Sequence, residues 1–303
     1  AITAAGDITA NGNIVGDSST NISGINSVTA TTFYGDGSGL SNTGISTTVL
    51  KSDPQHNLYA GTGAGANSDA DTCYNIGIGY SAATLLNAGD NNVILGCRAG
   101  SSVESGNMNV LIGMGAGKVV TSGCNVFLGR YAGACVTSGS RNIALGAPAG
   151  ARGLALGASA GSYNTTIGDC SGINLTSGNK NTFLGHYAGV CNSTGCCNTA
   201  IGTKALGGAG YITGNDNVAV GNFAGCGLCA GSYNIFMGTE SGKGSTSGGC
   251  NVALGKNTGT QVGGGTNNVF LGHNAGCCSY GQDNILIGSG AASGLTGGNW
   301  NTV

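Results

Sequence analysis

The chain has 303 residues, of which 62 are glycine, 2 are proline and 7% are charged, and its formal net charge is −2. This much glycine without a three-residue period excludes collagen, and an apolar fraction of 40% argues against a disordered chain. The weakly acidic balance gives no basic surface for nucleic acid, and no apolar run reaches the ~18 residues of a membrane-spanning helix. We therefore expect no nucleic-acid partner and no membrane span.

The N-terminal 50 residues differ in pattern from the rest of the chain. Residues 5–16 alternate apolar and small polar side chains between glycines, which is typical of short strands. We predict a β-rich N-terminal connector over 1–50 and a linker over 51–56, in which Pro54 interrupts any strand. Because the chain starts at Ala1 and stops inside a repeat, we expect it to be a segment of a longer polypeptide.

From Asn57 onward one phrase recurs with small changes, as in Asn-Val-Phe-Leu-Gly-Arg-Tyr-Ala-Gly at 125–133. Fifteen complete copies and a truncated sixteenth at Asn301 fill residues 57–303, and most of them begin 17 residues apart. The fifth residue of every complete copy is glycine, and the eighth is always small. Such a strict period is the signature of stacked coils, each of which needs its neighbours for stability.

The positions within one copy predict the shape of a coil. The second and fourth residues are mostly aliphatic or β-branched and point to one side of an extended strand, whereas the third residue points to the other side. A glycine corner, a weaker second strand and a polar turn follow. The apolar centres expected for the second strand are Leu86, Val103, Val120, Val136, Leu175, Leu228, Val262 and Leu295.

This pattern predicts an all-β fold, a repetitive β-solenoid or β-roll fibre shaft of about 17-residue coils. The copy at Gly153 is flanked by two shortened steps of 11 residues, so we expect a local waist or kink there, with the strand ladder continuing. The third residue of each copy, which points to the other side of the strand, is also mostly apolar. A strand that is apolar on both faces is buried on both, and we expect a partner chain in a homotrimer to cover one of them.

Three columns of residues carry these predictions. Stacking places the opening asparagines in one hydrogen-bonded ladder, as in other stacked-strand assemblies. The ladder comprises Asn75, Asn92, Asn109, Asn125, Asn142, Asn164, Asn181, Asn198, Asn217, Asn234, Asn251, Asn268 and Asn284. The corner glycines include Gly96, Gly113, Gly129, Gly146, Gly185, Gly221, Gly255 and Gly272. The apolar face between chains is assigned to Phe127, Phe183, Phe236 and Phe270.

Two motifs carry a resemblance to known proteins. Residues 30–40 read Ala-Thr-Thr-Phe-Tyr-Gly-Asp-Gly-Ser-Gly-Leu, a run that resembles segments of tail-fibre and other structural proteins of tailed phages, notably marine and cyanobacterial ones. The Asn-x-x-x-Gly-x-x-Ala-Gly copies resemble repeats in those fibres and, more distantly, the head repeats of trimeric autotransporter adhesins. The resemblance implies a homotrimeric fibre at a virion or extracellular surface. Its implied partners are other tail or fibre proteins and, through a distal tip, a host surface glycan or protein receptor.

The residue types that usually carry chemistry form no recognisable site. The thirteen cysteines fit either buried free thiols or disulfides across coils or between chains, and the single Cys226-x-x-Cys229 lacks the second pair that a zinc site needs. His186 and His273 share one repeat position, where solvated turn residues are a better interpretation than a metal-binding ring. No nucleophile–base pair and no repeating carboxylate pair can be named. We therefore predict no catalytic, cofactor or metal site and no enzyme.

Three functions fit this fold, and the one that the sequence supports best is given first. The first is a structural tail fibre or virion appendage that spans distance and supports host attachment. The alternative is a bacterial surface adhesin or extracellular filament protein built on the same physics. An ice-binding solenoid comes last, because threonine recurs at one turn position in only some coils and forms no regular array.

Overall fold

The computed structural model describes residues 51–147, 161–208, 210–261, 263–278, 281–294 and 297–303. The connector predicted over 1–50 and the copy predicted at Gly153 lie outside these residues. The described residues form strands and turns without any helix, so none of them builds a helix that could cross a membrane. The all-β solenoid predicted from the repeat is confirmed.

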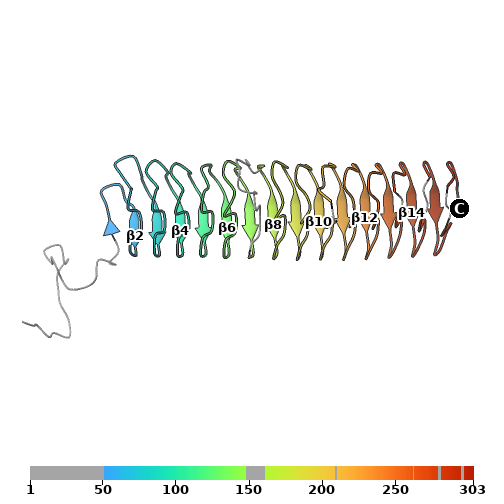
Figure 1. Ribbon diagram of the computed structural model, residues 1–303, viewed down its shortest axis with the longest axis horizontal. Helices are drawn as coiled ribbons and strands as arrows, with labels where there is room; N and C mark the ends of the chain where they lie inside the picture. Colours follow the sequence, from blue (N-terminus) through green and yellow to red (C-terminus); the bar gives the residue numbers. More distant parts are fainter. Residues whose placement is uncertain (1–50, 148–160, 209, 262, 279–280, 295–296) are drawn as a thin grey trace, which may run out of the picture. The chain divides into compact units, whose positions relative to one another are not determined.

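All strands belong to one sheet in which each strand lies beside its neighbour in the sequence (Figure 1). The strands are β1 (Lys51–Ser52), β2 (Leu58–Ala60), β3 (Ile76–Ile78), β4 (Val93–Leu95), β5 (Val110–Ile112), β6 (Val126–Leu128), β7 (Ile143–Leu145), β8 (Thr165–Ile167), β9 (Thr182–Leu184), β10 (Thr199–Ile201), β11 (Val218–Val220), β12 (Ile235–Met237), β13 (Val252–Leu254), β14 (Val269–Leu271) and β15 (Ile285–Ile287). From β2 to β15 every pairing is parallel and in register.

The ladder of strands continues past the irregular step in the repeat. Strand β7 pairs directly with β8, so that Ile143 lies opposite Thr165, and no strand stands between them. The copies at Asn142 and Asn164 are therefore adjacent coils of the stack, although 22 residues separate them in the sequence.

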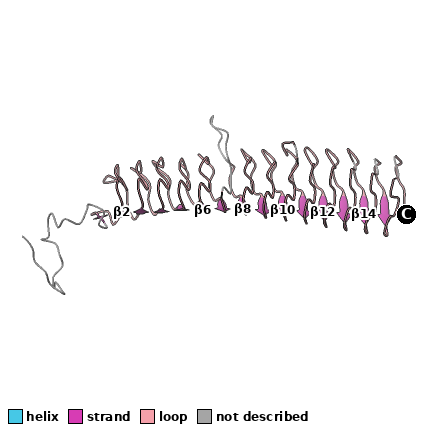
Figure 2. Cartoon of the chain, turned by 60° about the horizontal axis from the view of Figure 1, so that its bottom comes forward, coloured by secondary structure: helices cyan, strands magenta, loops and turns pink. Residues whose placement is uncertain are grey.

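Each coil contains one strand, and the second strand expected from the sequence is wrong for the described coils. The remainder of each coil is a series of turns, and Figure 2 shows the strands along one side of the stack with the turns along the other. In one coil Arg98 and Gly100 adopt φ values of 55° and 53°, which interrupt the extended conformation. Coil-to-coil hydrogen bonds persist here, as from Gly100 N to Ala116 O at 2.9 Å.

The core of the solenoid is narrow and is filled by three inward positions of each coil. The third residue of each copy, which is the middle residue of the strand, faces the small eighth residue, and an apolar residue of the turns completes the layer. One such set is Phe127, Ala132 and Val136, all buried. Close packing in so thin a section needs few atoms, which explains why the eighth residue is always small.

The assignment of four phenylalanines to a face between chains is wrong. Their side chains are 0–1% exposed within the single chain, inside its own core. A flat ring fits there because the residue six places later is glycine: a Cβ on Gly133 would lie 2.4 Å from the ring of Phe127. The side chains concerned are Phe127, Phe183, Phe236 and Phe270.

Candidate interaction surface

The opening asparagines form a continuous side-chain ladder along the inside of the solenoid. The backbone N–H and the Nδ2 group of Asn75 both donate to Oδ1 of Asn57, at 2.8 and 3.1 Å. Nδ2 of Asn75 also donates across its own coil to the carbonyl of Gly89 at 2.7 Å. Each amide thus links its coil to the previous one and also closes its own coil. Only a side chain with both an acceptor and a two-proton donor can do this, which selects asparagine over aspartate or serine.

In every described coil after the first, the backbone N–H of the ladder asparagine donates to Oδ1 of the preceding ladder asparagine, as from Asn142 to Asn125 at 2.9 Å. Most coils also have the second bond from Nδ2 to the same oxygen, which is missing at Asn142 and Asn198. The ladder side chains from Asn57 to Asn284 are 0–6% exposed. The thirteen asparagines predicted for the ladder all lie in it, and Asn57 and Asn301 extend it. Because buried amides are costly unless they are hydrogen-bonded, the ladder fixes the register of neighbouring coils.

The N-terminal end of the ladder is closed by a carboxylate. Asp53 lies in the stretch predicted as a linker, which instead contains β1 paired antiparallel with β2. Its Oδ1 accepts the backbone N–H of Asn57 at 2.9 Å, and its Oδ2 accepts the Asn57 amide at 2.9 Å. Asp53 therefore takes the place of a preceding asparagine and satisfies the donors of the first coil.

The corner glycines form a second column, in which backbone packs directly on backbone. Gly129 has a φ of 133°, and a Cβ built on it would lie 2.3 Å from the carbonyl oxygen of Gly146 in the next coil. No side chain fits such a gap, and the conformation itself favours glycine. The other corner glycines predicted from the sequence show the same close approach to the following coil: Gly96, Gly113, Gly146, Gly185, Gly221, Gly255 and Gly272.

The outward face of the sheet is an uncharged, mostly apolar stripe. It consists of the second and fourth residues of each copy, which are the first and last residues of each strand from β2 to β15 and point away from the core. Threonine interrupts the first of these two columns at β8, β9 and β10. Several are strongly exposed, for example Leu128 at 42%, Leu184 at 43% and Ile287 at 56%. With about 4.8 Å between strands, the stripe is roughly 60 Å long. The exposed large members are Ile78, Leu128, Ile143, Leu184, Ile201, Ile235, Met237, Leu271, Ile285 and Ile287.

A continuous apolar surface of this length is unusual on a soluble protein and marks an interaction site. The prediction from the sequence placed the phenylalanines on such a face. A partial signal for the inward position is present in the sequence. Glycine stands six residues after all four phenylalanines, but it also follows Ala219 and Ala253. The small residues Gly77 and Ala200 are instead followed by Ala83 and Leu206, so the two positions share one volume.

The cysteines form no disulfide within the described part of the chain. All thirteen are free, and each is half-buried or exposed, so the expectation of fully buried thiols is wrong. Burial raises the pKa of the Cys191 and Cys226 thiols, which disfavours the reactive thiolate. Disulfides between chains stay a prediction.

No metal-binding cluster of three or more His, Cys, Asp or Glu side chains occurs among the described residues. His186 and His273 are both exposed, and the His186 ring lies against Tyr187 with 4.3 Å between ring centroids. Neither histidine is buried against a second titratable group that would orient it as a ligand.

Comparisons with protein-family models, curated proteins and solved structures found no match for this chain. The class of protein therefore follows from the coil itself. It is a parallel β-solenoid repeat protein with an internal asparagine ladder, a glycine corner and an apolar outer sheet face.

Proposed function

We propose that the chain is the shaft of a fibre, in which three copies pack their apolar sheet faces around a common axis. The observation that carries the proposal is the uncharged stripe along β2–β15, since it is mostly apolar and extends over all of these strands. The asparagine ladder supports a rigid shaft, because sliding one coil against the next would break several buried hydrogen bonds at once.

The size of the stripe suits an interface between copies. A surface about 60 Å long and about 10 Å wide projects roughly 600 Å², and its ridged side chains raise the accessible area toward the ~800 Å² per partner of a stable complex. A water-soluble partner of other chemistry would need a matching apolar strip with the same spacing. A second copy of this chain has that strip by construction.

Within this class we propose a tail fibre or comparable virion appendage that supports host attachment. The resemblance of residues 30–40 to tailed-phage structural proteins supports this choice. Its partners would be other tail or fibre proteins and a host glycan or protein receptor bound at a distal tip. The resemblance of the repeats to trimeric adhesin heads favours a bacterial surface adhesin or filament as the second candidate. Capsid and tail genes beside the coding gene would support the first, and secretion genes would support the second.

The assembly is tested by measuring the mass of the particle in solution. We expect light scattering to give the mass of three chains of 29.2 kDa, and small-angle scattering to give a rod. The triple variant Leu128→Lys, Leu184→Lys, Leu271→Lys places charges on the stripe and should give monomers with intact circular dichroism. Three exposed turn residues provide the matched control with the same added charge: Ser138→Lys, Thr194→Lys, Ser247→Lys.

Three results would contradict the proposal. A wild-type monomer would show that the stripe is not an interface between copies, and an unchanged mass for the stripe variant would place the interface elsewhere. A mass of two chains would replace the threefold arrangement by a face-to-face sandwich of two sheets.

A further inference from the structure

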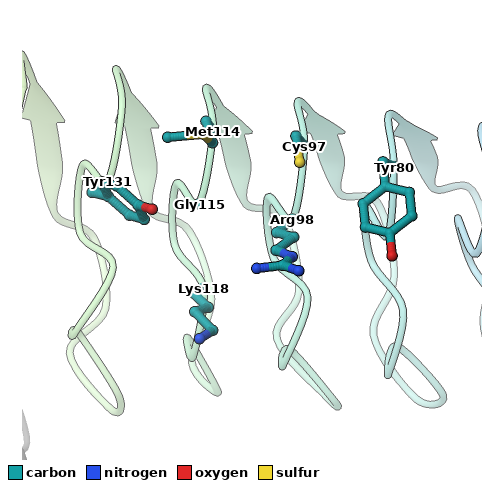
Figure 3. Close-up of a pocket in the computed structure, with 7 residues that line it drawn as sticks. All are labelled: Tyr80, Cys97, Arg98, Met114, Gly115, Lys118 and Tyr131. Carbon is teal, nitrogen blue, oxygen red and sulfur yellow. The ribbon is translucent and has the colours of Figure 1, made fainter.

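A groove lies on the outer surface just after the glycine corners of four successive coils. It has a volume of about 160 Å³ and is lined by Tyr80, Arg98, Met114, Gly115, Lys118 and Tyr131, among others (Figure 3). The volume is below the ~300 Å³ of pockets for drug-sized ligands, so it suits a single ring or a small ion.

The missing side chain of one coil sets the position of the Tyr131 ring in the groove. Gly115 stands at the seventh position of its coil, where the flanking coils carry Arg98 and Tyr131. A Cβ on Gly115 would lie 2.6 Å from the Tyr131 ring, so the ring occupies space that a side chain would take. Figure 3 shows the Tyr131 ring extending toward the coil of Gly115, with Arg98 on the coil at the other side of Gly115.

Two cationic side chains line the groove, and no described carboxylate neutralises their charge. Arg98 and Lys118 are both exposed and come from adjacent coils. Within the described residues the one ion pair joins Lys243 to Glu240, and no carboxylate lies within ion-pair distance of the two groove cations. In a chain with a net charge of −2, two unpaired cations beside a hollow form a local site for an anion.

The two ends of the groove are aromatic. Tyr80 and Tyr131 are 53% and 45% exposed, and the guanidinium of Arg98 lies 6.0 Å from the centroid of the Tyr80 ring. The two tyrosines belong to coils three steps apart, about 14 Å along the axis. Tyrosine offers an apolar face and a hydroxyl together, so it suits a ligand with one apolar and one polar surface.

We propose that this groove binds an acidic sugar residue, with its carboxylate or sulfate on Arg98 and Lys118 and its ring against Tyr131. Arginine pairs a planar carboxylate or sulfate through two parallel N–H groups, and lysine adds a point charge. Nucleic acid is the weaker alternative, because it needs a run of cations along its backbone and the groove offers two. This inference does not depend on the fibre proposal, since one chain supplies every lining residue.

The test is a titration of the full chain with small probes at low salt. Binding is measured by NMR saturation transfer and by calorimetry. The probes are glucuronic acid, glucose 6-sulfate, glucose and acetate. We expect the two acidic sugars to bind, and glucose and acetate each to bind at least about tenfold more weakly, because each lacks one half of the recognition. Equal binding of acetate and glucuronic acid, or of glucose and glucuronic acid, would overturn the proposal. A preference between the two acidic sugars would identify the anionic group.

Two variants locate the site. Arg98→Gln should weaken binding of glucuronic acid by about tenfold, since it removes a charged hydrogen-bond pair. Gly115→Ser should abolish binding, because its Cβ would lie 2.6 Å from the Tyr131 ring and would displace the ring from the groove. Serine is tolerated at this repeat position in another coil, where Ser81 adopts a φ of 52°. The control is Arg141→Gln, whose guanidinium bonds Tyr163 outside the groove at 3.0 Å. Unchanged binding in both test variants, or equal loss in the control, would refute the assignment.

Discussion

The described residues of the solenoid form two apolar cores. The first runs through the coils from Tyr59 to Ala144, and the second runs from Phe183 to Leu286. The coil of β8 has polar residues at two of its three core positions, with Thr166 in the place of the phenylalanines and Ser171 in the place of the alanines, while the third position keeps the buried Leu175. The stack is therefore interrupted as a hydrophobic core at this coil, which follows the irregular step in the repeat.

The asparagine ladder, by contrast, crosses this coil without a break. The backbone N–H of Asn164 donates to Oδ1 of Asn142 at 2.9 Å, and the backbone N–H of Asn181 donates to Oδ1 of Asn164 at 2.9 Å. Apolar packing and the polar ladder therefore have separate roles. Apolar packing stabilises each half, whereas the polar ladder and the sheet hydrogen bonds couple the halves.

The largest effect is expected from Asn164→Ala, which breaks the ladder between the two cores. Five hydrogen bonds to this amide and its backbone link it to Asn142, Gly178 and Asn181. The alanine leaves buried partners of the lost amide unsatisfied, at a cost of about 4 kcal/mol. We expect urea denaturation to change from one transition to two, one for each core.

The matched control for that variant is Asn217→Ala, which removes an equivalent amide inside the second core. Its partners Asn198, Gly231 and Asn234 are of the same kind. The loss of stability should be similar, but it should appear in hydrogen exchange of the second core alone. If amide hydrogen exchange changed equally in both cores and in both variants, the ladder at Asn164 would have no special role in coupling the two cores.

The next largest effect tests whether the cores are independent. Phe127→Ala and Phe236→Ala each empty a ring-sized space in one core and should each cost about 3–4 kcal/mol. Since the two rings belong to different cores, each substitution should increase amide exchange only in its own half. Increased exchange spread evenly over both halves would mean that the polar coil is not a boundary.

A smaller and opposite effect is expected from Thr166→Val in the intervening coil. The Thr166 hydroxyl bonds the carbonyl of Ile143 at 3.3 Å, a long hydrogen bond for a buried group. Valine keeps the shape and removes the poorly paired hydroxyl, so stability should rise by about 0.5–1 kcal/mol. The urea transition should also become steeper, because the two cores are joined. A loss of more than about 1 kcal/mol would show that the hydroxyl matters to the fold.

Sequence reasoning recovered the coil because each of its columns has a simple physical cause. Stacking restricts the first residue of the copy to asparagine and the fifth to glycine, so the repeat itself reveals both columns. Asn217 and Gly221 are the two residues in one coil. The orientation of the strand was not recoverable from alternation alone. Both faces are apolar, and only the shared volume of Phe127 and Gly133 distinguishes the inner face from the outer one.

The turns that replace the expected second strand, and the groove beside Gly115, could not be read from the sequence for a different reason. Both depend on residues with side chains held at positive φ, such as Arg98 and Tyr131, where glycine or asparagine is the usual choice. Local preference argues against that conformation. Hydrogen bonds to the neighbouring coils impose it, as from Tyr131 N to Met114 O at 2.8 Å.

The smallest effect is expected on the surface of the second half, where Lys243 pairs with Glu240 at 2.9 Å. Both side chains are largely exposed, and the lysine also lies 5.5 Å from the Phe223 ring centroid. Lys243→Ala should change the unfolding free energy by about 0.5 kcal/mol or less, because solvent screens such pairs. Raising the salt concentration should remove even that difference. A larger loss in urea denaturation would mean that surface charges, and not only the core and the ladder, hold the coils of the second half together.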